Sequence, residues 1–132
     1  RPGTVLLAPG DRHLRVVRHC GRLVAALDAG PKVSGYRPSV DVLFESVANV
    51  MGPRALGVVL TGMGEDGAAG VRKLKQRGGY TIAQDRDSCI VYGMPKAAAE
   101  TGCVDQVVPL SKMALTIAAA LRRLKVTQAV HV

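Results

Sequence analysis

The sequence predicts an α/β fold: a doubly wound, mostly parallel sheet with helices on both faces and a β-hairpin at its edge. Segments typical of strands alternate with helical segments between residues 39 and 125. This rhythm indicates βαβ units. The apolar run at 55–60 has no polar alternation, which is typical of a strand covered on both faces. A chain of 132 residues allows one domain or part of one.

The first 38 residues are expected to form short strands and loops. Thr4–Ala8 is typical of a strand that ends at Pro9. Residues 13–17 and 22–27 are rich in β-branched and aliphatic side chains and enclose a polar turn. This pattern predicts a hairpin, which we place at the sheet edge. Glycines and prolines make residues 28–37 a loop.

A helix is expected to follow from Ser39, whose side chain can cap it, while Asp41 favours the helix dipole from the first turn. Helical spacing gives this helix one buried face, formed by Val40, Leu43, Phe44, Val47, Ala48 and Met51. Glycine and proline at 52 and 53 end it.

The strand at 55–60 leads through Thr61 into a glycine-rich turn, and helix 67–76 follows with Val71 and Leu74 inward. Glycines let the chain turn sharply there. The remaining elements expected are a strand at 80–83, an apolar segment at 89–92, a helix at 95–101, a strand at 104–108, a helix from its cap Ser111 to 125, and a tail at 126–132.

The formal net charge of +8 can indicate nucleic acid. No stacking aromatic residues accompany the basic ones, so we expect no nucleic-acid partner. An acidic protein partner and a plain solvated surface both remain open. Cys20, Cys89 and Cys103 lack metal-ligand spacing and are expected to be reduced thiols. No stretch has membrane-spanning length or a signal-peptide layout, so a soluble, cytoplasmic protein without membrane insertion is expected.

The turn after the central strand has the spacing of a dinucleotide-binding fingerprint. Gly62, Gly64 and Gly67 form GxGxxG between a strand and a helix, and Asp85 lies 18 residues further on. A Rossmann-type dinucleotide-binding module is therefore one hypothesis for this chain.

Two acidic residues in the same turn argue against that hypothesis. Glu65 and Asp66 would repel a pyrophosphate at the helix N-terminus, where the helix dipole instead stabilises carboxylates. The turn therefore presents an anion. Such a carboxylate can ligate a metal, act as a base or orient a histidine, and a simple helix cap is the structural alternative. Only Glu65, Asp85 and Asp87 lie nearby in sequence, so no metal or cofactor is expected.

Four segments resemble the chemotaxis-receptor protein-glutamate methylesterases of the CheB type. They are LLAPGDRHL (6–14), RPSVDVLFESVA (37–48), GVVLTGMGEDGAAG (57–70) and TIAQDRDSCIVYGMPKAA (81–98). They span nearly the whole chain in the family's order. The resemblance implies a doubly wound α/β catalytic domain that hydrolyses glutamyl methyl esters on the cytoplasmic part of chemoreceptors. Many members also deamidate glutamines. The family uses a Ser-His-Asp triad without metal or cofactor.

The resemblance also implies roles for residues of the glycine turn. Asp66 matches the triad aspartate, which accepts a hydrogen bond from the imidazole and stabilises the imidazolium. Met63, between Gly62 and Gly64, matches the position whose backbone N–H helps to hold the oxyanion.

The family's serine and histidine motifs precede the position of Arg1, and neither occurs in this chain. His13 matches another segment and is expected to be structural or to line a cleft. We therefore expect residues 1–125 to be the C-terminal portion of a methylesterase catalytic domain, inactive alone. Its expected partners are methyl-accepting chemoreceptors and the missing N-terminal part or a receiver domain. A non-catalytic interaction domain derived from the methylesterase is the third hypothesis.

Overall fold

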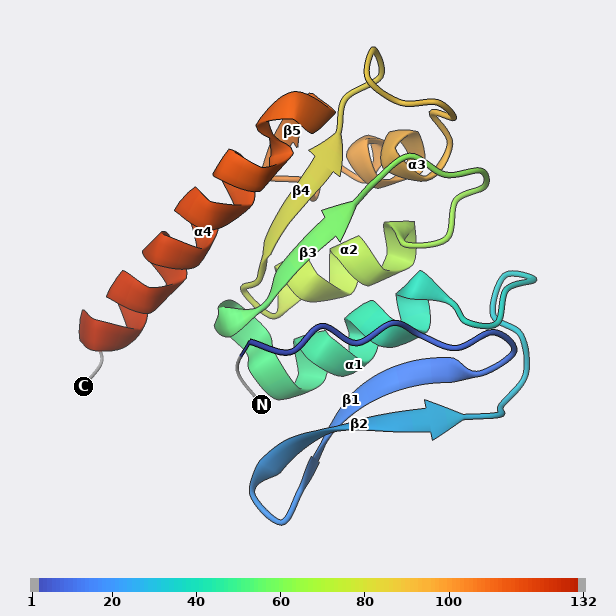
Figure 1. Ribbon diagram of the computed structural model, residues 1–132, viewed down its shortest axis with the longest axis vertical. Coiled ribbons are helices and arrows are strands. Elements are labelled where there is room, and N and C mark those ends of the chain that lie inside the picture. Colours follow the sequence, from blue (N-terminus) through green and yellow to red (C-terminus); the bar gives the residue numbers. More distant parts are fainter. Residues whose placement is uncertain (1–2, 131–132) are drawn as a thin grey trace.

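The computed structural model describes residues 3–130, with side chains described for residues 3–124. Figure 1 shows a sheet with helices on both faces and a separate hairpin, which confirms the predicted α/β class. The elements are β1 (His13–His19), β2 (Arg22–Asp28), α1 (Val40–Met51), a 3-10 turn (Gly52–Arg54), β3 (Leu56–Val59), α2 (Ala68–Gln76), β4 (Tyr80–Gln84), α3 (Met94–Glu100), β5 (Gln106–Val108) and α4 (Leu110–Val130).

The main sheet has the strand order β3-β4-β5, and both strand pairs are parallel, as predicted. Central Ile82 pairs with Val58 on one side and with Gln106 on the other. Its side chain is fully buried. The strands therefore end at a common edge, where a parallel sheet gathers its functional groups.

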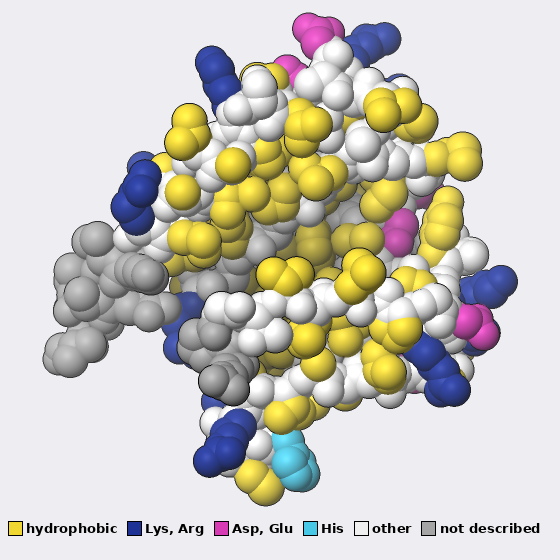
Figure 2. Space-filling view, in the orientation of Figure 1, with side chains coloured by type: hydrophobic (Ala, Val, Ile, Leu, Met, Phe, Trp, Pro, Cys, Tyr) yellow, Lys and Arg dark blue, Asp and Glu magenta, His cyan; other side chains and the backbone are white. Residues whose placement is uncertain are grey.

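Each face of the sheet has its own apolar cluster. On one face Val59 packs with Val71 of α2 and Ala98 of α3. On the other, Ile82 packs with Met113 and Ala120 of α4, and the neighbouring β3 side chains are only partly buried. Figure 2 shows hydrophobic side chains lining a hollow on the face turned to the viewer. Helix α4 thus covers β4 and β5 better than it covers β3.

The hairpin is confirmed, but its placement at the edge of the sheet was wrong. Strands β1 and β2 form a two-stranded sheet of their own beneath α1 (Figure 1). The Val16 N–H of β1 donates to Ser46 Oγ of α1 at 2.9 Å, so a helix rather than a strand occupies this edge. Helix α1 is therefore covered on two sides, which explains why Val42 and Ser46 are buried although the predicted face omitted them.

Two further expectations about the ends of the chain were wrong. Thr4–Ala8 forms no strand, because it pairs with no neighbour in the described chain, and Val5 and Leu7 are fully exposed. Helix α4 begins at Leu110, so Ser111 lies inside it. The helix also continues to Val130 through most of the expected tail, and residues 131–132 lie outside the described residues. No described helix, including α4, is long and apolar enough to cross a membrane.

We predict that Gly70→Ala lowers the free energy of unfolding by about 2 kcal/mol. A Cβ on Gly70 would lie 2.6 Å from Phe44 Cβ and 3.2 Å from Asp41 Cα, so α1 would have to move away from α2. Urea denaturation measures the change. Gly10→Ala is the control, because nothing lies within 4 Å of its added Cβ. Equal effects of the two substitutions would contradict this account of helix packing.

Candidate functional site

Asp66 lies in the turn between β3 and α2, and only 4% of it is exposed. Its Oδ2 accepts the Val40 N–H at 2.7 Å. Its Oδ1 accepts the Asp41 N–H at 3.0 Å and the Ser39 hydroxyl at 2.8 Å. The carboxylate therefore caps the N-terminus of α1. The expected cap, Ser39, occupies the N-cap position but turns its hydroxyl to Asp66 and bonds no helix N–H.

Asp41 caps the N-terminus of α2 in the same way. Its Oδ1 accepts the N–H groups of Gly67 at 2.9 Å and of Gly70 at 2.7 Å. Burial raises the pKa of Asp41; the bonds from Gly70 and Gly67 oppose this, and the neighbouring Asp66 charge adds to it. Each helix is thus capped by a carboxylate from the segment that begins the other.

This exchange argues against the dinucleotide hypothesis. A pyrophosphate binds a helix N-terminus through backbone N–H groups that face it. At the N-terminus of α2, the N–H groups of Gly67 and Gly70 already donate to Asp41. The GxGxxG turn is therefore part of the contact between α1 and α2.

The segment that precedes α3 holds the glycine turn in shape. The Gly62 N–H donates to Val91 O at 3.1 Å, and the Met94 N–H donates to Gly62 O at 2.8 Å. A Cβ on Gly93 would lie 2.7 Å from Gly62 O, so this approach requires glycine. Two distant parts of the sequence, GMG and YGMP, thus form one rigid unit.

Gln84 is a site residue that sequence reasoning missed. It is 1% exposed at the end of β4. Its Oε1 accepts the Thr61 N–H at 2.8 Å, and its Nε2 donates to Ser88 O at 2.8 Å. It therefore holds the end of β3 where the glycine turn starts. The signal in the sequence was the single amide side chain, Gln84, at the end of the strand 80–84.

Met63 stands at the tip of the turn with its side chain 77% exposed. Among the described residues, none accepts a hydrogen bond from the Met63 N–H. A backbone donor without a partner among the described residues thus lies between Gly62 and Gly64. Such a donor can bind an oxygen that develops negative charge.

A groove of about 570 Å³ opens beside this turn. It is lined by Ser34, Tyr36, Gly64, Glu65, Tyr92, Gly93, Lys96, Ala97 and Glu100. The Val33–Tyr36 turn forms one wall and is closed by two backbone hydrogen bonds of 3.0 and 2.9 Å. Positive φ at Ser34 and Gly35 makes it a tight type I′ turn. The groove is large enough to receive side chains of a substrate.

His13 is structural, as expected. It is 1% exposed. Its Nδ1 accepts the Ser39 N–H at 3.2 Å, and its Nε2 lies 2.8 Å from Pro31 O, which it can reach only as a donor. Both ring nitrogens are occupied, so His13 is not placed to act as a base. Among the described side chains, no group of three or more His, Cys, Asp or Glu could hold a metal ion.

Comparison with known proteins gives consistent matches. The family model for CheB methylesterase matches residues 1–117. A protein-glutamate methylesterase/protein-glutamine glutaminase of Anaeromyxobacter dehalogenans is 54% identical over 113 residues, which cover 86% of this chain and 32% of that protein. The protein of the same name from Treponema pallidum is 56% identical over 117 residues, 89% of this chain and 29% of that protein.

The structural comparison agrees. The crystal structure of the Thermotoga maritima CheB methylesterase catalytic domain matches with a TM-score of 0.79 and 38% sequence identity. The match covers 89% of this chain and 58% of that domain. The chain spans about a third of the length of the curated relatives it matches.

We predict that Asp66→Ala lowers the free energy of unfolding by about 3 kcal/mol, because it leaves two partly buried N–H groups of α1 and the buried Ser39 hydroxyl without their acceptor. Urea denaturation provides the measurement. Glu65→Gln, an exposed neighbour in the same turn, should change stability by less than about 0.5 kcal/mol. A loss as small for Asp66→Ala as for Glu65→Gln would rule out the capping role.

We also predict a distinct pH dependence for Asp41→Asn, whose Oδ1 can still accept both α2 N–H groups. Because the folded-state pKa of Asp41 is raised, its protonated form favours folding. That contribution is present below the ordinary value of 3.8 and is lost as the pH rises through the folded pKa. The difference in unfolding free energy, original chain minus Asp41→Asn, should therefore fall with rising pH.

Denaturation series from about pH 3 to 7 measure this difference. Asp105 titrates in the opposite sense: burial works to raise its pKa, but hydrogen bonds from Lys75 and the Thr81 N–H lower it. It is present in both proteins, so its contribution cancels. A difference that rises with pH would contradict the assignment to Asp41.

Proposed function

Since this chain belongs to the CheB methylesterase family, we propose that the protein containing it hydrolyses glutamyl methyl esters on chemoreceptors during chemotaxis adaptation. The names of its relatives also include glutaminase, so we extend the proposal to glutamine deamidation. The reaction would take place on the cytoplasmic part of methyl-accepting receptors.

The observation that carries this proposal is the held carboxylate of Asp66. A carboxylate offers about four acceptor positions. The three described bonds use two on Oδ1 and one on Oδ2, so one position on Oδ2 remains. In the proposed role, Asp66 accepts the imidazole N–H there and stabilises the imidazolium as serine attacks the ester. Its rigid setting gives that imidazole one orientation.

The oxyanion role falls to the neighbouring turn. As the ester carbonyl becomes tetrahedral, its oxygen gains negative charge, and the Met63 N–H between Gly62 and Gly64 can donate to it. The bonds of Gly62 to Val91 and Met94 support this role, since they hold the donor in place before the reaction begins. The adjoining groove is a suitable place for the receptor segment next to the ester.

The nucleophilic serine and the general-base histidine would come from a part of the protein outside these 132 residues. That part, with a receiver domain, is then a partner of residues 1–125. A chain with one triad member of three is expected to bind without turnover. The non-catalytic interaction domain is the alternative, in which receptor binding persists and the protein that includes the upstream region also lacks esterase activity.

We predict that these 132 residues alone release no methanol from methylated receptor, whereas the protein that includes its upstream region does. In that longer protein, Asp66→Asn should lower kcat about 10⁴-fold, because the histidine loses the acceptor that sets its tautomer. Glu45→Gln, at an exposed position of α1 outside the groove, is the control and should stay within about tenfold. Turnover by the isolated chain that disappears in Asp66→Ala would overturn the proposal of a missing serine and histidine.

A further inference from the structure

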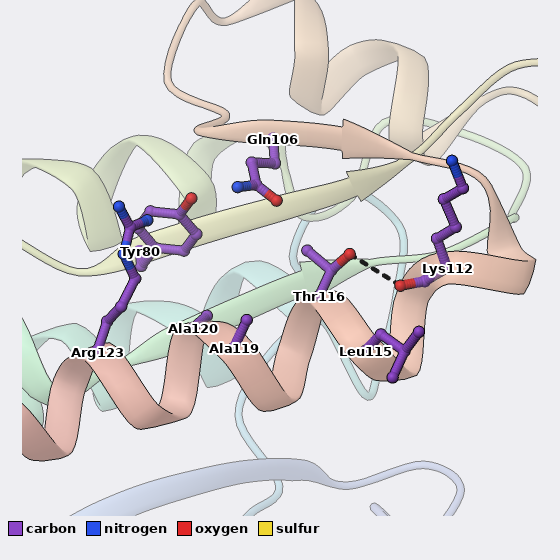
Figure 3. Close-up of a pocket in the computed structure, with 8 residues that line it drawn as sticks. All are labelled: Tyr80, Gln106, Lys112, Leu115, Thr116, Ala119, Ala120 and Arg123. Carbon is purple, nitrogen blue, oxygen red and sulfur yellow. Dashed lines mark hydrogen bonds between the residues drawn. The ribbon is translucent and has the colours of Figure 1, made fainter.

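A second cleft, of about 340 Å³, lies between α4 and the strands β4 and β5. Figure 3 shows its strand wall, with Tyr80 and Gln106, and its helix wall on α4. The helix wall is formed by Lys112, Leu115, Thr116, Ala119, Ala120 and Arg123. None of these residues belongs to the proposed catalytic turn or lines the groove beside it.

The cleft is hollow because small side chains face the strands. Met113 and Ala120 anchor α4 in the core against Ile82. Beside them, Ala119 and Thr116 leave space opposite Gln106, whose side chain points toward the helix (Figure 3). The Thr116 hydroxyl donates to Lys112 O at 2.8 Å within the helix. The centre of the helix wall therefore presents mainly apolar surface.

Positive charge stands at both ends of this apolar wall. Lys112 and Arg123 are eleven positions apart on α4, a separation of about 16 Å along the helix axis. Figure 3 shows both side chains extending toward the strand side, with Arg123 beside the ring of Tyr80. None of the described residues that line the cleft is acidic. The cleft is thus an apolar surface between two cations.

We propose that this cleft binds an extended acidic segment of a protein partner. One carboxylate meets Lys112, another meets Arg123, and small apolar side chains between them cover Leu115, which is 74% exposed. A span of about 16 Å corresponds to about five extended residues. The Gln106 amide supplies a donor and an acceptor for the peptide backbone. Tyr80 is the single aromatic among the lining residues, which disfavours the base stacking that nucleic acids need.

Fluorescence anisotropy tests the proposal with a labelled peptide that has two glutamates at each end and Leu-Ala-Ala between them. The full chain should bind this peptide, bind it more weakly as salt rises, and bind the glutamine-for-glutamate peptide at least tenfold less tightly. The double substitution Lys112→Gln with Arg123→Gln should weaken binding about tenfold. Because this readout involves neither an ester nor Asp66, it is independent of the proposed function.

Two further variants separate the cleft from general charge and from misfolding. Arg72→Gln with Lys73→Gln removes the same charge from exposed positions on α2 and should leave binding unchanged. Ala119→Leu keeps both cations, fills the cleft and should weaken binding. Thermal midpoints by circular dichroism establish that each variant is folded. Equal loss in the α2 variant, no effect of Ala119→Leu, equal binding of the glutamine peptide, or displacement of the peptide by a single-stranded oligonucleotide at lower concentration would each overturn the proposal.

Discussion

Two carboxylates, each placed where one helix begins, hold the N-termini of α1 and α2 against each other. Asp66 accepts the first N–H groups of α1, and Asp41 accepts those of α2. An unsatisfied buried N–H costs about 1–3 kcal/mol, so neither helix start can be buried without this exchange. Gly70 allows the close approach, because any side chain there would meet Phe44. The position of the hairpin follows, since β1 is bonded to Ser46 on the other side of α1.

The same constraint gives the site its shape. The β3–α2 turn is held from below by α1, from the side by Gln84 through Thr61, and from above by the segment that precedes α3. Its tip, Met63 to Glu65, is exposed to solvent, whereas Asp66 and Gly67 are buried. Rigid support of this kind is what a preorganised donor needs, because a displacement of about 1 Å can cost about a hundredfold in rate.

Much of this could be predicted from local patterns, and the rest could not. The alternation of strands and helices gave the parallel sheet, and charge alone showed that the GxGxxG turn does not suit a phosphate. The bond between Ser39 and Asp66 could not be predicted, because sequence pattern alone makes the Ser39 hydroxyl a local helix cap. Only the fold brings the carboxylate, 27 positions away in the sequence, within 2.8 Å of it. The edge position of the hairpin failed for a similar reason, because Ser46, which bonds β1, lies outside the helix face that spacing alone assigns to the core. Chemistry came from the resemblance to a family and not from periodicity.

If the proposed triad role of Asp66 is added to its observed capping of α1, an evolutionary consequence follows. A residue that only assists a reaction is free to drift once that reaction is no longer needed. Asp66 is not free in this way, since its loss would also release the start of α1. Descendants that have abandoned catalysis would therefore keep the aspartate under selection for folding alone. Retention of the acid is therefore poor evidence of an active enzyme, and the serine and histidine of the proposed triad are the positions whose loss would mark a pseudoenzyme.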